Sequence, residues 1–278
     1  MLHTDPAKRQ YSYTALSQWM LCQRRYYWSY VRNLTLDVSP AAPHFGQAIH
    51  AALKTWYDTR DEGAMLAEFR KAYAGAPPDV LRTEGKGELI LRGYVKKWGV
   101  EPFKVLSNEE EFSIPMPGGS TLIGRWDRVI EWDGRLLCKE TKTTSSGVGA
   151  SFFKGFSPNL QVDIVCYAVA KKYGRCDGIL IDALQVLKTK EEYARDVQDR
   201  TLKDLERFLV RYQQIVDDIE TTTAAHALRD DRGHFLQNQL MCTYYGECPY
   251  RRLCLYDDDS LIEGHYKLRE TQEPKEDP

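Results

Sequence analysis

The sequence predicts a mixed α/β protein in which a central mixed sheet is flanked by helices. Two observations support this prediction. Apolar residues recur at helical spacing before residue 100, whereas apolar and polar residues alternate over residues 103–116. The chain has 278 residues, of which 42% are hydrophobic and 12% aromatic, so it can bury a core and is too apolar to remain unfolded.

Four helices are expected in the first part of the chain. They cover residues 11–32, 44–60, 66–73 and 87–98. Ser12 or Thr14 is a suitable N-cap for the first helix. Pro40 and Pro43 separate the first helix from the second, because proline interrupts a helix interior.

Three strands are expected next. They cover residues 103–116, 121–132 and 135–142. Asp133 and Gly134 separate the last two strands and form the Asp-Gly pair that is typical of a two-residue hairpin turn. The last two strands are therefore predicted to form a tight antiparallel hairpin.

The remainder of the chain returns to helix and strand. We expect a helix over 158–172, strands over 178–187 and 191–198, a helix over 201–222 and a short Cys-rich segment over 241–256. Pro158 at the start and Gly174 just past the end delimit the first of these helices.

Composition limits the classes of protein that fit. The 38 Lys and Arg residues nearly balance 40 Asp and Glu residues, so a basic DNA-binding surface would have to be local. No apolar run approaches the ~18 residues of a membrane span, and residues 1–10 are too polar for a secretory signal. Seven cysteines, an odd number, favour a reducing cytoplasm over a disulfide scaffold.

The predicted hairpin carries a group of charged residues. Asp127 lies on its first strand, and Glu140 and Lys142 lie on one face of its second. Two carboxylates and a backbone carbonyl suit Mg²⁺ or Mn²⁺, and a neighbouring lysine can orient water or stabilise charge on a phosphoryl group. The alternative is a surface hairpin with an ordinary Glu–Lys pair.

Three other polar residues are candidates for the same site. His50 follows Gly46 by one helical turn among small residues, so it can approach another element and add a ligand. Gln161 and Tyr167 lie on the helix that follows the hairpin. The alternatives are a histidine satisfied within the helix surface or core, and an ordinary amphipathic helix.

The cysteines suggest a second kind of site. Cys242, Cys248 and Cys254 lie within thirteen residues, and Cys22 lies in the first helix. Four thiolates can hold zinc or an iron–sulfur cluster, and the wide spacing favours a 4Fe–4S cluster over zinc. Such a cluster would tie the two ends of the chain together. The alternative is a set of buried, unrelated thiols.

In this order, the motifs resemble those of the PD-(D/E)XK nuclease superfamily, in its RecB-like Fe–S branch. Members of that branch include the nuclease domain of AddB, CRISPR-associated Fe–S exonucleases and RecB-family exonucleases of phages. The resemblance covers residues 11–256 and depends on the order of the motifs. The matching elements are the helix with one cysteine over residues 12–30, His50, the Asp motif over residues 124–129, Glu140 with Lys142 and Thr143, and Cys242, Cys248 and Cys254.

Two positions depart from the family pattern. The family usually has Gln-x3-Tyr, whereas Gln161 and Tyr167 are six residues apart, and Asp163 lies one turn before Tyr167. Which of these three acts is therefore open. Relatives commonly have Cys-x2-Cys-x5-Cys, whereas both gaps here contain five residues.

The resemblance implies a restriction-endonuclease-like core and a metal-dependent deoxyribonuclease, expected to be an exonuclease of phage or bacterial recombination or repair. We expect one nuclease domain over residues 1–268 and a flexible tail over 269–278. Within the domain, residues 11–100 would be helical, 101–200 catalytic, and 201–268 the C-terminal helix and cluster segment.

The resemblance also implies residue roles. His50, Asp127, Glu140 and the backbone carbonyl of Thr141 would bind Mg²⁺ or Mn²⁺, with Mn²⁺ preferred because of the histidine. Lys142 would help to activate the attacking water, assisted by Gln161 and Tyr167. Cys22, Cys242, Cys248 and Cys254 would hold a 4Fe–4S cluster that is structural or positions DNA.

Basic and aromatic residues near the cluster cysteines are candidates for DNA contact. They are Arg24, Arg25, Tyr27, Arg251 and Arg252. Arginine neutralises phosphates and aromatic rings stack on unpaired bases, so single-stranded or end-bearing DNA is the expected partner. The alternative is a helix surface on which long side chains cover apolar area.

Other functions compete with the nuclease. The first is a non-catalytic Fe–S DNA-binding module, against which the complete Asp–Glu–Lys set argues. The second is a redox or regulatory Fe–S protein, for which no dinucleotide-binding glycine loop is found. The chain has no Gly-x4-Gly-Lys-Ser/Thr loop, so any unwinding would need a helicase or recombination partner. CRISPR adaptation is the alternative biological setting. Cleavage polarity and oligomeric state do not follow from the sequence.

Overall fold

The computed structural model describes residues 8–37, 40–229, 231–244, 246–256 and 258–269. The chain divides into two units, each assembled from separate stretches of sequence. Unit 1 contains Met1–Asp37, Ser113–Gly124 and Arg207–Pro278, and unit 2 contains Val38–Phe112 and Arg125–Glu206. The expected tail lies outside the described residues, apart from Arg269.

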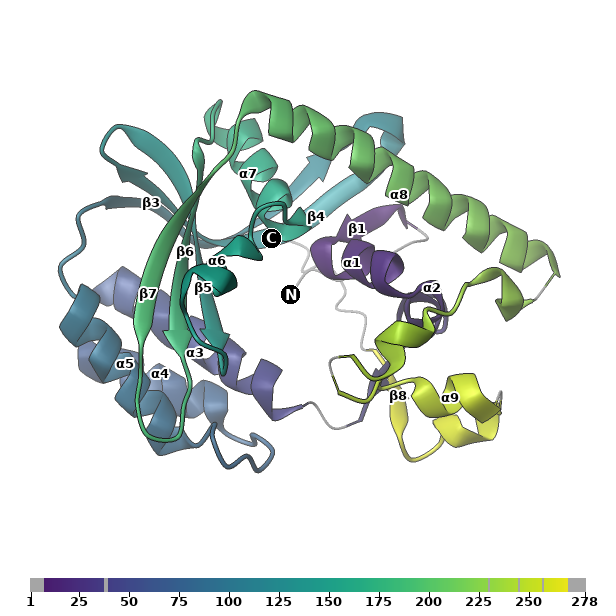
Figure 1. Ribbon diagram of the computed structural model, residues 1–278, viewed down its shortest axis with the longest axis horizontal. Coiled ribbons are helices and arrows are strands. Elements are labelled where there is room, and N and C mark those ends of the chain that lie inside the picture. The colour runs from purple at the N-terminus through teal and green to yellow at the C-terminus, as the bar shows by residue number, and fades with distance from the viewer. Residues whose placement is uncertain (1–7, 38–39, 230, 245, 257, 270–278) are drawn as a thin grey trace, which may run out of the picture. The chain divides into compact units, whose positions relative to one another are not determined.

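Unit 2 is built on a mixed sheet, as predicted (Figure 1). Its strands are β3 (Lys104–Pro115), β4 (Thr121–Trp132), β5 (Arg135–Thr144), β6 (Gly178–Gln185) and β7 (Tyr193–Asp199). The strand order is β4-β5-β6-β7, and β3 pairs with β4. β5 and β6 are parallel, whereas β4–β5 and β6–β7 are antiparallel.

The predicted hairpin is present. Asp133 and Gly134 connect β4 to β5 with φ values of 50° and 72°. Two consecutive positive φ values define the primed turn that matches the twist of an antiparallel hairpin. The turn fixes the register in which Arg128 pairs with Lys139, which places the charged segments of both strands close together.

The helices of unit 2 follow the predicted pattern, with one addition. They are α3 (Ala41–Thr59), α4 (Glu62–Tyr73), α5 (Glu84–Trp98), α6 (Ala150–Lys154) and α7 (Leu160–Tyr173). The prediction began α3 three residues too late, because Pro40 is its N-cap and Pro43 lies in its first turn, where proline is tolerated. The five-residue helix α6 is too short to give a periodic signal.

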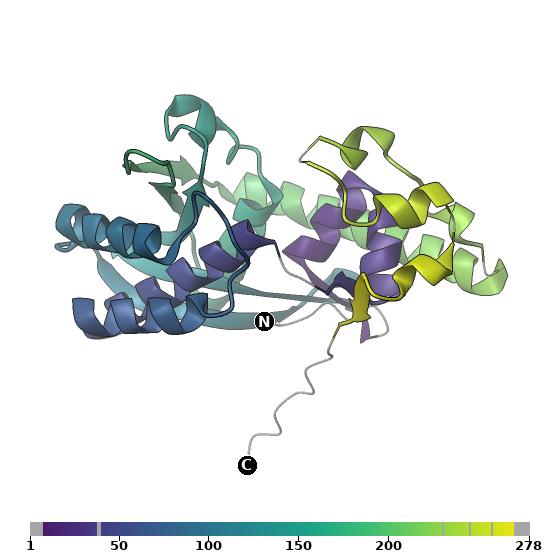
Figure 2. The ribbon, with the colours of Figure 1, turned by 90° about the horizontal axis from the view of Figure 1, so that it is seen from below.

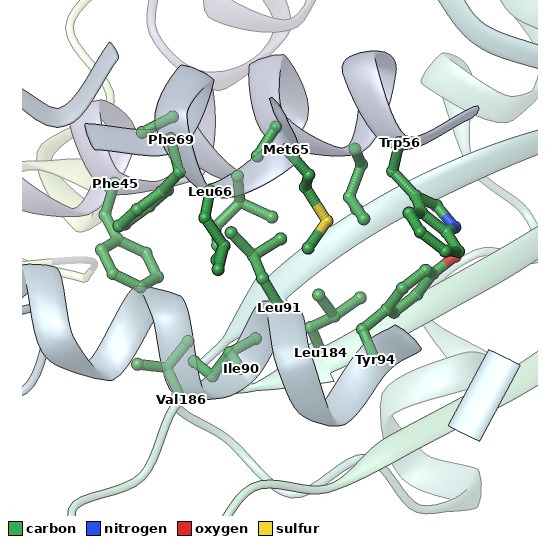
Figure 3. Packing of buried hydrophobic residues seen from close by; sticks show 14 of the residues in the cluster. Phe45, Trp56, Met65, Leu66, Phe69, Ile90, Leu91, Tyr94, Leu184 and Val186 are labelled. Carbon is green, nitrogen blue, oxygen red and sulfur yellow. The ribbon is translucent and has the colours of Figure 1, made fainter. Parts of the chain in front are cut away.

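Helices α3, α4 and α5 pack together and against β6 to form the main core. Figure 3 shows Phe45 of α3, Phe69 of α4 and Leu91 of α5 meeting Leu184 of β6 in one apolar layer. These four side chains are completely buried. In Figure 2 the same helices are the blue ribbons that lie beside one another.

Helix α7 packs on the other face of the sheet. Alternate residues of β5 point to opposite faces: Lys139 Nζ donates to Tyr94 of α5, 3.1 Å away, whereas Glu140 accepts from Gln161 of α7 at 2.7 Å. The side chain of Asn159 caps α7 at its N-terminus, and Gly174 ends it in the left-handed conformation that favours glycine.

Unit 1 joins the two ends of the chain. Its elements are β1 (Gln10–Ser12), α1 (Tyr13–Leu21), α2 (Gln23–Tyr26), the π-helical turn η2 (Tyr27–Val31), β2 (Leu34–Leu36), the larger part of α8 (Leu202–Arg229), α9 (Arg251–Tyr256) and β8 (Tyr266–Leu268). β1 pairs in parallel with the first residues of β4, and β2 pairs antiparallel with β8. Helix α1 lies beside α8 (Figure 1), and Trp19 Nε1 of α1 donates a 2.8 Å hydrogen bond to Asp218 Oδ2 of α8.

The prediction of one helix over residues 11–32 is wrong. Ser12 does cap α1, but the helix ends at Cys22, whose backbone is extended. There the backbone N–H groups of Arg24 and Asn238 donate to Leu236 O and to Cys22 Sγ. A contact with a distant segment therefore replaces the helical hydrogen bond of the Arg24 N–H.

Helix α8 ends at Arg229 rather than at the predicted residue 222. Three consecutive threonines at residues 221–223 weaken the helical propensity there, and the helix continues through them. In the described part of the chain, no helix combines the length and the apolarity needed to cross a membrane.

Candidate active site

Asp127 and His50 meet at the inner side of the hairpin in unit 2. Asp127 is buried on β4, and its Oδ2 accepts a 2.7 Å hydrogen bond from the backbone N–H of Thr141 on β5. His50 of α3 places Nδ1 3.2 Å from Asp127 Oδ1. The carboxylate is thus fixed by the neighbouring strand on one side and by the helix on the other.

A glycine allows α3 to approach the hairpin. Gly46 lies one turn before His50, and a Cβ atom added to it would lie 3.5 Å from Thr143 Oγ1 of β5. A longer side chain would occupy the space between helix and strand. A small residue at this position, glycine or alanine, therefore leaves room for α3 beside β5.

The structure adds a third carboxylate that the sequence analysis missed. Glu109 of β3 is almost fully buried, and its Oε1 lies 3.6 Å from His50 Nδ1. Its Oε2 forms a 3.0 Å ion pair with Arg125 Nε. Glu109 is the first of three consecutive glutamates, and its φ of 51°, within the continuous strand β3, distinguishes its backbone from that of its neighbours.

Glu140, Lys142 and Gln161 form a second cluster of contacts. Lys142 Nζ donates to Glu140 Oε1 at 2.8 Å and to Gln161 Oε1 at 2.9 Å. The Gln161 amide nitrogen in turn donates to Glu140 Oε1 at 2.7 Å. The lysine and the carboxylate therefore have fixed positions relative to each other and to α7.

The surroundings of the site shift the pKa values of Asp127 and Glu140 in opposite directions. Burial favours a neutral Asp127, but His50, Arg128 and the Thr141 N–H outweigh it and lower the pKa of Asp127. Burial and the nearby Asp127 raise the pKa of Glu140. Burial would lower the pKa of His50, yet the carboxylates of Asp127 and Glu109 raise it to about 10.

The donor set fits a hard divalent cation. His50, Glu109 and Asp127 offer ligand atoms that all lie within 4.8 Å of one another. The buried Oε1 atom of Glu109 has no hydrogen-bond partner among the described residues. Oxygen ligands with one imidazole nitrogen are a set that Mg²⁺ tolerates and Mn²⁺ accepts readily.

Helix α7 distinguishes the three polar residues whose roles the sequence left open. Gln161 is the one that contacts Glu140 and Lys142. Asp163 instead forms a buried ion pair with Arg200, at 2.7 Å from Nε. Tyr167 follows Gln161 by six residues. Its side chain is buried, and burial raises its pKa.

The four cysteines expected to hold a cluster lie in unit 1 and are half-buried. Cys22 Sγ accepts a hydrogen bond from the Asn238 N–H at 3.4 Å, and Cys254 Sγ accepts one from Trp28 Nε1 at 3.3 Å. Burial raises the pKa of Cys254, and the charges of Cys248 and Cys22 add to the rise. Two of the four sulfur atoms thus accept a hydrogen bond from an N–H group, and the charges of two of these cysteines act on a third.

The candidate DNA-contacting residues differ in their surroundings. Arg24 is buried, and its Nε donates to Phe235 O at 3.1 Å. Tyr27 is also buried, with its ring against Phe235. These two side chains pack against Phe235 in the interior of unit 1. They are therefore not exposed for contact with DNA. Arg25 and Arg251 are half-buried, and Arg252 is exposed.

Comparison with known proteins identifies the family of the chain. A scan against family models matches residues 10–255 to the PD-(D/E)XK nuclease superfamily. Among solved structures, the chain resembles a protein from Eubacterium rectale provisionally assigned as an exonuclease, with a TM-score of 0.53 and 13% identity over 91% of this chain and 93% of that one. It also matches the protein SSO0001, with 14% identity over 64% of this chain and 74% of that one, but a TM-score of 0.31 supports no argument. A search of curated proteins found no match.

Proposed function

The chain belongs to the PD-(D/E)XK nuclease superfamily, and we propose that it is a metal-dependent deoxyribonuclease that degrades DNA from an end. The convergence of His50, Glu109 and Asp127 beside the Glu140–Lys142 pair is the observation that supports this proposal most strongly. A binding module would have no need for a buried acidic cluster next to a fixed lysine.

His50, Asp127, Glu140 and the backbone carbonyl of Thr141 are proposed to hold Mg²⁺ or Mn²⁺, and we add Glu109 to this set. When bound, the ion lowers the pKa of water and neutralises charge on the scissile phosphate. The low pKa of Asp127 keeps its carboxylate ionised and ready to bind a cation at neutral pH. The imidazole nitrogen favours Mn²⁺, the softer of the two ions.

Lys142 is proposed to act on the attacking water. Glu140 Oε1 and Gln161 Oε1 hold its Nζ in place, at 2.8 Å and 2.9 Å. A positive charge fixed in this way can orient the water and stabilise the negative charge that develops on the phosphoryl oxygens. Gln161 is a positioning residue in this account, since its amide group contacts both Lys142 and Glu140. The role of Tyr167 stays a prediction.

In unit 1, Cys22, Cys242, Cys248 and Cys254 are proposed to bind a 4Fe–4S cluster. The N–H groups that donate to Cys22 and Cys254 suit thiolate ligands, because hydrogen bonds to cluster sulfurs stabilise their negative charge. The cluster would stabilise unit 1, in which the two ends of the chain pair through β2 and β8. We assign hydrolysis to unit 2 alone.

DNA is the proposed substrate, and Arg25, Arg251 and Arg252 are the proposed phosphate contacts that the structure leaves outside the core of unit 1. Phage or bacterial recombination or repair is the setting that fits a DNA-end nuclease, with a helicase partner supplying unwinding. The seven free cysteines suit the reducing cytoplasm of such a cell.

Cleavage of end-labelled DNA tests this function. Anaerobically purified protein is incubated with single- and double-stranded DNA in Mg²⁺ or Mn²⁺, beside Glu140→Gln and the control Glu131→Gln, which changes an exposed residue of β4. We expect cleavage that requires metal, releases short products from one end, and falls at least about 100-fold only in Glu140→Gln. Internal cuts would exclude the exonuclease, and cluster-loaded protein that binds DNA without cutting it would favour the binding module.

A further inference from the structure

Three cysteines that the proposed function does not use meet in the core of unit 2. Cys138 lies on β5, Cys166 on α7, and Cys176 just before β6. Their sulfur atoms all lie within 4.8 Å of one another, and Cys138 Sγ is 4.0 Å from Cys176 Sγ. Each side chain is at least nine-tenths buried. Single buried cysteines are common, but three convergent ones from three elements form a ligand set.

The spacing suits one metal ion. With metal–sulfur bonds of about 2.3 Å, three thiolates around an ion in one plane lie about 4.0 Å apart, and a tetrahedral ion sets them at about 3.8 Å. An equilateral triangle with 4.8 Å sides has its centre about 2.8 Å from each corner, by simple geometry. Contraction by a few tenths of an ångström therefore brings all three sulfurs to bonding distance.

We propose that Cys138, Cys166 and Cys176 form a second metal site, which binds one thiophilic divalent ion of the zinc group. Thiolate ligands select soft or borderline ions over Mg²⁺ and Mn²⁺, so this site would not compete for the metal of the nuclease centre. A divalent ion leaves a net charge of −1 on three thiolates, whereas Cu⁺ would leave −2, a larger cost in a buried position.

The neighbouring groups support a sulfur-only set of protein side chains. The acidic side chains nearest in sequence have other partners. Glu140 pairs with Lys142, Asp163 pairs with Arg200, and Asp177 Oδ2 accepts from the Leu136 N–H at 2.7 Å. The carbonyl oxygen of Gly178 lies 3.3 Å from Cys176 Sγ and is a candidate for the fourth ligand.

A bound ion would join the two elements that carry the proposed catalytic groups. Cys138 precedes Glu140 by two residues and shares its face of β5. Cys166 follows Gln161 on α7 by five residues. The ion would thus hold α7 on β5 next to the contact between Gln161 and Glu140. This inference goes beyond the proposed nuclease and does not depend on it.

Peptide-resolved alkylation with Cd²⁺ as the probe tests this site. The full-length protein is treated with a thiol reagent under mild denaturation, with and without Cd²⁺ at about 100 times its Kd. Because a ligand at that concentration lowers the unliganded population about 100-fold, we expect Cys138, Cys166 and Cys176 to react together about 100-fold more slowly. Absorption by new cadmium–thiolate bonds reports the binding itself.

Two variants separate the triad from the cysteines of unit 1. In Cys176→Ser the protection of Cys138 and Cys166 should fall below about tenfold, whereas the control Cys242→Ser should retain it. Equal reaction rates of the three thiols with and without Cd²⁺ in the unmodified protein would overturn the proposal, even if a variant does not fold. Full protection of Cys138 by Cd²⁺ in Cys176→Ser would also overturn the proposal. The slower alkylation would then be explained by a general stabilisation of the folded protein by Cd²⁺ and not by binding to the triad.

Discussion

At the scale of single residues, Asp127 is the centre of the proposed nuclease site. One of its oxygens accepts from the Thr141 N–H, and the other faces His50. Both interactions favour the ionised form of Asp127. A metal ion that takes the place of the His50 proton would therefore lie next to a carboxylate that is already negatively charged. Glu109 extends this charge to a third strand, since its unpartnered Oε1 also faces His50.

Replacement of Glu109 tests its proposed role as a metal ligand. We expect Glu109→Gln to weaken Mn²⁺ binding about 10- to 100-fold, because the amide keeps the shape of the side chain and removes its charge. Calorimetric titration with Mn²⁺ measures the affinity. The control is Glu111→Gln, an exposed residue of the same strand. Equal Mn²⁺ affinity in both variants would remove Glu109 from the site.

Local patterns identified some site residues and not others. The Asp-Gly turn predicted that Asp127 and Glu140 lie on adjacent strands, and strand alternation predicted that Glu140 and Lys142 share a face. Glu109 could not be separated from Glu110 and Glu111, because its direction depends on a positive φ that no sequence pattern signals. The burial of Arg24 and Tyr27 depends on their packing against Phe235, more than 200 residues away.

At the scale of elements, β5 separates two kinds of chemistry. Its Glu140 face contacts α7 and the proposed catalytic groups. On the other face Lys139 is completely buried and pairs with Asp182 of β6, which also accepts from Arg195 of β7 at 3.0 Å. A shift in the register of β5, β6 or β7 would break this network and leave a buried charge without a partner. The network therefore favours the observed register of the three strands.

Stability at acid pH should depend on this network. Burial would raise the pKa of Asp182, but Lys139 and Arg195 outweigh it and lower the value to about 2. The ionised form therefore stabilises the folded state by about 2 kcal/mol above about pH 4, and this contribution is lost as the pH falls towards 2. Urea unfolding at pH 5 and pH 3 measures it.

Asp182→Asn should remove about 1 kcal/mol of the difference in unfolding free energy between pH 5 and pH 3. The matched control is Asp133→Asn, in the exposed turn where asparagine tolerates a positive φ. An unchanged pH dependence in Asp182→Asn would show that the network is not ionised as described.

Element boundaries were predictable where the signals are local. Asn159 and Gly174 delimit α7, and Asp133 and Gly134 delimit the hairpin. The break at Cys22 was not predictable, because the Arg24 N–H donates to Leu236 O and the Cys22 sulfur accepts from the Asn238 N–H, both more than 200 residues away. Tertiary contacts of this kind override helical propensity.

At the scale of the whole molecule, the sequence predicted the mixed α/β class. It also predicted a cluster that ties the chain ends together, which stays a prediction, whereas the pairing of β2 with β8 was not predicted. The grouping of Ser113–Gly124 with both ends was not predictable, since it follows from the parallel pairing of β1 with β4. The proposed inorganic groups differ between the units, with a cluster in unit 1 and, in unit 2, the metal of the nuclease centre and the ion of the cysteine triad.

Loss of the proposed cluster should affect the units differently. We expect oxidation in air, or Cys254→Ser, to lower hydrogen-exchange protection in unit 1 and to leave β5 and β6 of unit 2 protected. The physical reason is that the cluster would crosslink segments of unit 1 that are far apart in sequence. Anaerobic protein is the reference. Equal loss of protection in β5 and β6 would contradict this separation.

The central claim is that the Asp127 cluster binds the metal with which this protein hydrolyses DNA. Its most direct test is the rate of DNA cleavage as a function of Mn²⁺ concentration for the unmodified protein and Asp127→Asn. We predict a rate that saturates with Mn²⁺ in the first, disappears on chelation, and falls at least about 100-fold in the second. Cleavage that persists in a chelator, or that is equally fast in Asp127→Asn, would contradict the claim.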